Sequence, residues 1–115
     1  MVDLLRTRDL TRGEKLYVKR NRLGITQLEM SVSMGVVPAQ YRAMEQDVEG
    51  SEAPYITLGA SLEPRESYTI MRRRAGYSRA ELAEEIGVSA FWLRKMEKGL
   101  APIKRLADYW GGEDQ

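Results

Sequence analysis

Residues 71–99 read MRRRAGYSRAELAEEIGVSAFWLRKMEKG and contain the start and stop signals of consecutive short helices. Ser78 begins the capping box SRAE, in which the hydroxyl accepts a free backbone N–H and Glu81 reaches back to the serine N–H. Gly76 suits the left-handed turn that ends a preceding basic helix. After the next turn, at Gly87, Ser89 is a favourable N-cap. The order helix, glycine, capped helix, turn, helix is therefore expected here.

A shifted copy of this pattern lies earlier in the chain. With a shift of 52 residues, positions 14–45 align with 66–97 without a gap, and ten of the 32 pairs are identical. Thr26 begins the matching capping box TQLE, Gly24 precedes it, and Pro38 opens the third predicted helix. Apolar positions keep the same phase in both copies. The sequence thus predicts two tandem units, each with the spacing of a helix-turn-helix motif.

The rest of the chain fits around these units. We expect an all-α fold with the first, more divergent unit in residues 1–50, a linker in 51–64, the second unit in 65–112 and a frayed tail in 113–115. The linker either is irregular or holds one strand at Tyr55–Leu58. Pro102 is expected to open a last helix whose Ile103, Leu106 and Ala107 cover the core.

Charge is unevenly distributed along the 115 residues, although the net charge is only +1. Residues 1–24 carry seven basic and three acidic side chains, and residues 64–107 carry ten basic and five acidic ones. Residues 45–63 carry five acidic side chains and no basic one. A basic block is either a solvated face or the footprint of a nucleic-acid partner.

Composition excludes most catalytic chemistry. The chain has no cysteine and no histidine, and therefore no thiolate and no imidazole for catalysis or metal binding. No apolar run approaches the roughly 18 residues of a membrane span, and the N-terminus lacks a secretory signal. We expect a non-enzymatic cytoplasmic protein without metal, cofactor or membrane partner.

Residues 71–99 resemble the Cro and lambda-repressor-like helix-turn-helix family, including its Glu-Leu-Ala, Gly-Val-Ser and Glu-x-Gly elements. Residues 18–46 resemble it less closely, because Val37-Pro38 replaces the usual cap, Met30-Ser31 replaces Leu-Ala, and no glycine follows Glu45. The resemblance implies a regulator that binds double-stranded DNA, of the repressor type found in phages, plasmids and mobile elements of bacteria. It also implies that the third helix of a unit enters the major groove.

The resemblance implies three sets of site residues. Those expected to contact bases are Ala90, Phe91, Trp92, Arg94 and Lys95 in the second unit, and Gln40 and Arg42 in the first. Those expected to contact phosphates are Arg79, Ser89, Lys98, Lys104 and Gln27. Two structural ion pairs, Arg72 with Glu97 and Arg20 with Glu45, are expected to lock the two units.

Two alternatives remain open from the sequence. Phe91 and Trp92 are also the kind of aromatic pair that anchors a protein interface, so the chain is alternatively an interaction module for a protein such as a polymerase, repressor or nuclease. The divergent first unit either reads DNA itself, so that one chain spans a site, or mediates binding of a protein partner or a homodimer.

Overall fold

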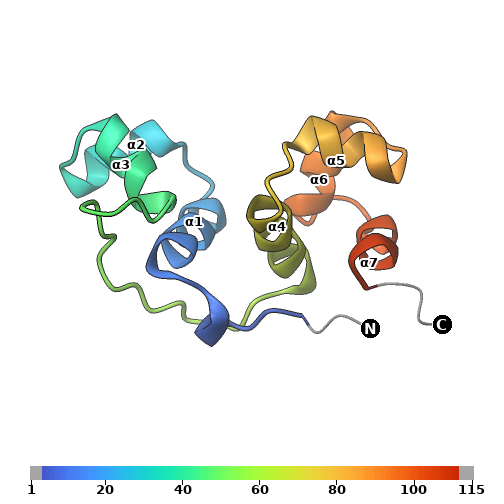
Figure 1. Ribbon diagram of the computed structural model, residues 1–115, viewed down its shortest axis with the longest axis horizontal. Coiled ribbons are helices and arrows are strands. Elements are labelled where there is room, and N and C mark those ends of the chain that lie inside the picture. The colour runs from blue at the N-terminus through green and yellow to red at the C-terminus, as the bar shows by residue number, and fades with distance from the viewer. Residues whose placement is uncertain (1–3, 112–115) are drawn as a thin grey trace. The chain divides into compact units, whose positions relative to one another are not determined.

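The computed structural model describes residues 4–111, and in that range every regular element is a helix (Figure 1). The chain divides into two compact units, which are described separately. Within the described residues, the first unit is Arg6–Ser61, and the second is 62–111 together with Leu4 and Leu5. The all-α prediction is confirmed. The predicted frayed tail, 113–115, lies outside the described residues.

The first unit contains a short 3-10 turn, Thr7–Asp9, and three helices, α1 (Arg12–Leu23), α2 (Gln27–Met34) and α3 (Pro38–Glu45). The predicted capping box at Thr26 forms: its hydroxyl oxygen accepts the N–H of Glu29 at 3.0 Å. Gly35 ends α2 in the left-handed conformation with a φ of 73°. Helix α3 packs on both α1 and α2.

The core of the first unit is closed by a segment that the sequence analysis assigned to the linker. Leu16, Met30, Tyr41 and Met44 from the three helices are joined in this core by Ala53, which is 1% exposed, and Ile56 packs against them. The strand alternative at Tyr55–Leu58 is not realised, since these residues have no regular secondary structure. Of these four residues, Ile56 packs on the core, whereas Tyr55 is 85% exposed.

The second unit contains four helices, α4 (Pro64–Arg74), α5 (Arg79–Ile86), α6 (Ala90–Glu97) and α7 (Lys104–Gly111). Helix α6 packs on α4 and α5, and α7 packs on the same two helices. Leu106 of α7 is fully buried in the core, and Ile103 and Ala107 pack against it, as expected. The predicted start of this helix was two residues early, because Pro102 precedes α7 and does not begin it.

In both units, a glycine and a larger residue lie against each other where the start of the first helix meets the end of the third. In the first unit, the backbone N–H of Gly13 in α1 donates to the carboxylate of Asp47 at 2.9 Å, and Asp47 itself adopts a positive φ of 56°. In the second unit, the equivalent residues are Arg65 and Gly99. Arg65 Nη1 donates to the carbonyl oxygen of Glu97 at 3.0 Å and lies against Gly99, which has a φ of 80°. In the first unit the glycine is at the start of the first helix and the larger residue follows the third helix. In the second unit the larger residue is at the start of the first helix and the glycine follows the third.

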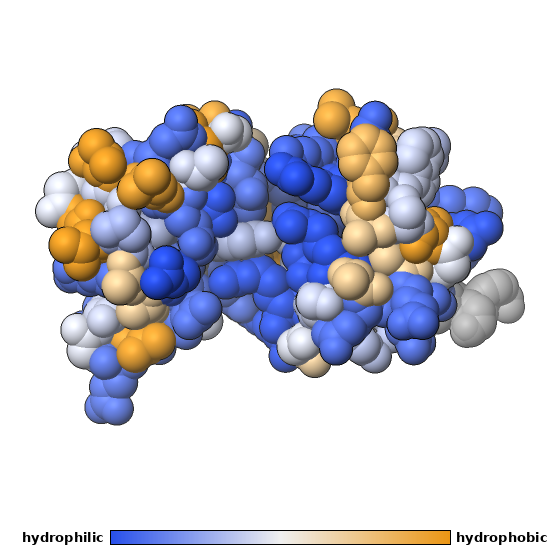
Figure 2. All heavy atoms as spheres, turned by 90° about the horizontal axis from the view of Figure 1, so that it is seen from above, coloured by the Kyte–Doolittle hydropathy of each residue, from blue (hydrophilic) through white to orange (hydrophobic). Residues whose placement is uncertain are grey.

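Not all apolar side chains of the first unit are buried. Leu28 and Val32 on α2 and Val37 in the turn before α3 are exposed to solvent. Figure 2 shows hydrophobic residues gathered over this unit on the face that is visible there. The fold of the unit does not require them, because its core is formed by other residues.

The close packing at Gly13 predicts a large effect of a small substitution. In Gly13→Ala, the new Cβ would overlap the backbone oxygen of Met44 and the Asp47 carboxylate. We expect the free energy of unfolding to fall by about 1 to 3 kcal/mol, as for other overpacked sites. Urea denaturation followed by circular dichroism measures the change.

The matched control is Gly59→Ala, where an added Cβ meets nothing within 4 Å. This variant should be neutral or slightly stabilising, because alanine restricts the unfolded chain. Equal stabilities of the two variants would contradict the packing described for Gly13.

Candidate nucleic-acid interface

Helix α6 presents most of the residues that the sequence analysis assigned to base contacts. Ser89 caps the helix, and its hydroxyl oxygen accepts the N–H of Trp92 at 3.0 Å. Ala90, Phe91 and Arg94 are exposed, and Phe91 is 67% exposed. Lys95 follows Phe91 by one helical turn, and its Nζ lies 5.0 Å from the centre of the Phe91 ring. These side chains therefore form one outward surface of α6.

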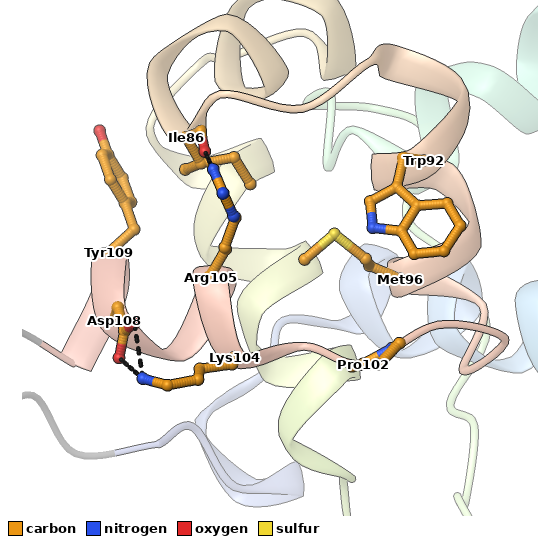
Figure 3. Close-up of a pocket in the computed structure, with 8 residues that line it drawn as sticks. All are labelled: Ile86, Trp92, Met96, Pro102, Lys104, Arg105, Asp108 and Tyr109. Atoms are coloured by element: carbon orange, nitrogen blue, oxygen red, sulfur yellow. Dashed lines mark hydrogen bonds and ion pairs between the residues drawn. The ribbon is translucent and has the colours of Figure 1, made fainter.

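Trp92 lies on a different side of α6. It is 42% exposed and lines a groove between α6 and α7, together with Met96, Pro102 and Tyr109 (Figure 3). Its side chain thus forms part of the wall of this groove, beside the outward surface of α6. The structure brings Phe91 and Lys95 together but separates Trp92 from them.

A buried carboxylate holds α6 in place from behind. Glu97 Oε2 lies 2.7 Å from Arg72 Nε of α4, and Glu97 Oε1 lies 2.9 Å from Arg79 Nε of α5. Arg72 also donates to the carbonyl oxygen of Tyr77 at 2.9 Å, in the turn between α4 and α5. Because one carboxylate binds side chains from two other helices, the orientation of α6 is fixed relative to both.

The first unit contains the same arrangement with one replacement. Arg20 Nε lies 2.7 Å from Glu45 Oε2, and Arg20 Nη1 donates to the carbonyl oxygen of Ile25 at 3.1 Å. Gln27 donates to Glu45 at 2.9 Å, as Arg79 does to Glu97. The structure thus forms both ion pairs expected from the sequence. It also places two residues expected on phosphates, Gln27 and Arg79, within these networks.

Electrostatics in the first unit favour the charged pair. Burial alone would lower the pKa of Arg20, but the hydrogen bond and the charge of Glu45 outweigh it and raise the pKa above its usual value. Burial, followed by the neighbouring Glu45, also raises the pKa of Tyr41 well above its usual value. Both shifts favour the protonated forms, which are the charged arginine and the neutral tyrosine.

Of the other residues expected on phosphates, Ser89 and Lys98 cap the two ends of α6, and Lys104 begins α7. Lys98 is exposed just after the helix. Lys104, whose side chain is 82% exposed, pairs with Asp108 at 3.0 Å on the surface of α7 (Figure 3). Ser89 uses its oxygen as an acceptor for the helix cap, so its hydroxyl proton is available for donation outward.

Helix α3 of the first unit has a different surface. Gln40 and Arg42, the two residues expected on bases, are exposed, but their neighbours Pro38 and Ala39 are apolar and are also exposed. Helix α2 exposes Leu28 and Val32, where α5 carries Ala80 and Glu84. The first unit therefore offers fewer hydrogen-bonding groups to a polar ligand than the second.

Two arginines that the sequence analysis did not single out support the second unit. Arg105 of α7 donates to the carbonyl oxygen of Ile86 at 2.8 Å and thus caps the C-terminal end of α5. Arg65 binds the carbonyl oxygen of Glu97 at the end of α6. Both bonds join residues far apart in the chain, so no local sequence signal identifies them.

Two further observations concern the described residues, 4–111. They contain no group of three or more acidic side chains, histidines or cysteines placed to hold a metal ion. None of the helices in this range has the length and apolar character needed to cross a membrane.

The shared carboxylate gives a stability prediction. Glu97→Ala leaves the buried Arg72 without its counter-charge and should lower the free energy of unfolding by about 3 kcal/mol or more. Lys104→Ala removes an exposed ion pair of the same unit and should change it by less than about 1 kcal/mol. Thermal and urea unfolding of both variants measure the difference. A small effect of both would mean that Glu97 does not hold the helices together.

Comparison with known proteins agrees with this architecture for the second unit. Residues 69–111, less than half of the chain, match the family model of a helix-turn-helix domain. No curated protein and no solved structure matches the chain. The matched range runs from within α4 to the end of α7 and includes the capped α5, the turn at Gly87 and α6. Over these residues the second unit is thus similar to a helix-turn-helix domain.

Proposed function

We propose that the protein is a transcriptional regulator that binds double-stranded DNA in a sequence-specific manner through its second unit. The observation that carries the proposal is the outward surface of α6, where Phe91, Arg94 and Lys95 project from a helix whose buried side is fixed by Glu97. In helix-turn-helix proteins the second helix of the motif lies in the major groove. In this domain that helix is α6.

The chemistry of this surface fits base edges. Arg94 and Lys95 are donors suited to the O6 and N7 acceptors of guanine, and Ala90 and Phe91 are suited to the methyl group of thymine. Trp92, which faces the groove beside α7, is proposed to contact the edge of the DNA backbone or a base at the margin of the site. Contacts of this kind supply discrimination between sequences.

Phosphate contacts are proposed from both sides of α6. Ser89 and Lys98 lie at its two ends, and Lys104 lies on α7. Arg79, at the start of α5, has 39% of its side chain exposed although its Nε binds Glu97. Its terminal guanidinium nitrogens are proposed to bind a phosphate at the positive end of α5. These contacts set the register of the domain on DNA and supply salt-dependent affinity.

The finer aspects of the proposal rest on the resemblance and on the duplication. We propose that the protein is a Cro-like repressor of the phage or mobile-element type, built from two tandem helix-turn-helix units. Gln40 and Arg42 are the groups of the first unit suited to bases, and Gln27, bound to Glu45, is its candidate phosphate ligand. The second unit carries the main reading surface.

One observation favours a second candidate function. Trp92 and Tyr109 are both partly exposed along the groove between α6 and α7, and exposed aromatic side chains are typical anchors of protein interfaces. An interaction module for a protein partner would use this groove. The DNA proposal is preferred because Arg94 and Lys95 lie on the adjacent outward surface of α6 and add positive charge there.

The recognition surface is tested by Arg94→Ala combined with Lys95→Ala. A duplex is first selected from a random library with the wild-type protein, and its binding is then titrated by fluorescence anisotropy. We expect the double variant to lose about 1 to 3 kcal/mol of binding free energy per base-contacting side chain. Preference for the selected duplex over random DNA should fall with it.

The control for this experiment removes the same charge elsewhere. Lys15→Ala combined with Lys19→Ala changes two half-buried lysines of α1 and should leave the preference for the selected duplex intact. If the α6 double variant keeps full preference while its circular dichroism is unchanged, α6 is not the reading helix.

The phosphate role of Arg79 is tested by a substitution that the chain itself provides. Arg79→Gln copies the first unit, where Gln27 holds the equivalent glutamate at 2.9 Å, so the fold should be retained. We expect weaker binding to specific and random DNA alike, with the slope of log affinity against log salt reduced by about 1. An unequal loss on the two DNAs would contradict a simple phosphate contact.

A further inference from the structure

The first unit exposes a set of branched apolar side chains that its own core does not use. Leu28 and Val32 lie one turn apart on α2 and are 59% and 72% exposed, and Val37 before α3 is 62% exposed. We name these three residues the apolar face. It lies on the helix pair that corresponds to α5 and α6 of the second unit.

The duplication shows that the apolar face is not needed for folding. The second unit carries Ala80, Glu84 and Ser89 at the equivalent positions and forms the same two helices. Buried positions of the two copies, in contrast, keep apolar residues, as at Met30 and Leu82. The difference between the copies at the apolar face is confined to the surface, where it affects what the surface binds.

The charges around the apolar face indicate its partner. In α2, α3 and the turn between them, the charged residues that are exposed are Glu29 on α2 and Arg42 on α3. One cation beside apolar side chains is a poor match for a row of phosphates. A neutral apolar face with one acid on one helix and one base on the other is self-complementary. In a two-fold arrangement, Arg42 of each copy can approach Glu29 of its partner, whose Oε1 also accepts the N–H of Thr26 at 2.8 Å. Arg42 in this interface does not contact bases, so the dimer replaces base reading by the first unit.

We propose that the apolar face is an interface between two copies of this chain. Three partly exposed branched side chains offer an apolar area on the order of 300 Å² per copy, which is comparable with the largest apolar patch on a typical monomer. Even with its polar surroundings, such an interface falls below the roughly 1,200 Å² of total buried area typical of stable complexes. The dimer is therefore weak, with dissociation in the micromolar range or above.

The dimer is useful to the proposed DNA-binding function but does not depend on it. Each copy brings one second unit, and paired helix-turn-helix domains read two related half-sites. Weak association in solution becomes effective when both second units are held on one DNA molecule. The free protein should nevertheless dimerise without DNA, so the two proposals are tested separately.

The test is sedimentation equilibrium of the purified full chain over a concentration range from about 1 µM to 1 mM, which spans the weak affinity expected for a small interface. The wild-type protein should show a reversible monomer–dimer equilibrium. Leu28→Ala combined with Val32→Glu gives α2 the residues of α5 at these positions, so the helix should still form. Each dimer then contains two buried charges, and the dissociation constant should rise by about 100-fold or more.

Leu100→Ser is the matched control, because Leu100 is 70% exposed but belongs to the second unit. It should leave the equilibrium unchanged. A wild-type protein that stays monomeric at 1 mM overturns the proposal, as does dimerisation that survives the double substitution or is lost with the control. Arg94→Ala combined with Lys95→Ala should dimerise normally, so a failure of DNA binding alone leaves the dimer proposal standing.

Discussion

The architecture of each unit depends on one buried ion pair between its first and third helices. Arg72 Nε lies 2.7 Å from Glu97 Oε2 in the second unit, and Arg20 Nε lies 2.7 Å from Glu45 Oε2 in the first. Each arginine also binds a carbonyl oxygen in the turn after its own helix, which ties that turn to the third helix. Because a buried charge without its partner is costly, the pair specifies one arrangement of three short helices. Short helices of this kind have little stability of their own.

The duplication separates what the fold requires from what each surface does. The ion pair, the capping boxes and the left-handed turns at Gly35 and Gly87 recur in both copies. On the third helix the exposed arginine recurs as Arg42 and Arg94, but its neighbours differ, since Phe91 and Lys95 stand where the first unit has Ala39 and Ala43. A common framework therefore carries a polar surface with basic groups in one unit and an apolar one in the other. This division is the physical basis for assigning the two units different partners.

Local signals explain which features could be predicted from the sequence. The caps at Thr26, Ser78 and Ser89 act within one helical turn. The local sequence at these residues was therefore sufficient to predict the starts of α2, α5 and α6. The contacts of Asp47 with Gly13 and the burial of Ala53 join residues that are distant in the chain, and no short pattern encodes them. The absence of a glycine after Glu45 is now explained, because Asp47 adopts the left-handed conformation there, as Asp and Asn do more readily than other side chains.

The candidate site was predicted less completely than the fold. Exposure and position on α6 followed from helical spacing, but the direction of Trp92 toward α7 depends on tertiary packing. The engagement of Arg79 with Glu97 depends on it as well. The base and phosphate contacts themselves remain predictions. Backbone amide shifts from NMR, recorded while a duplex is added, test the central claim most directly. We predict that the largest changes fall at the start of α5 and along α6. Changes confined to α2 and α3, or none with any duplex, would contradict the account.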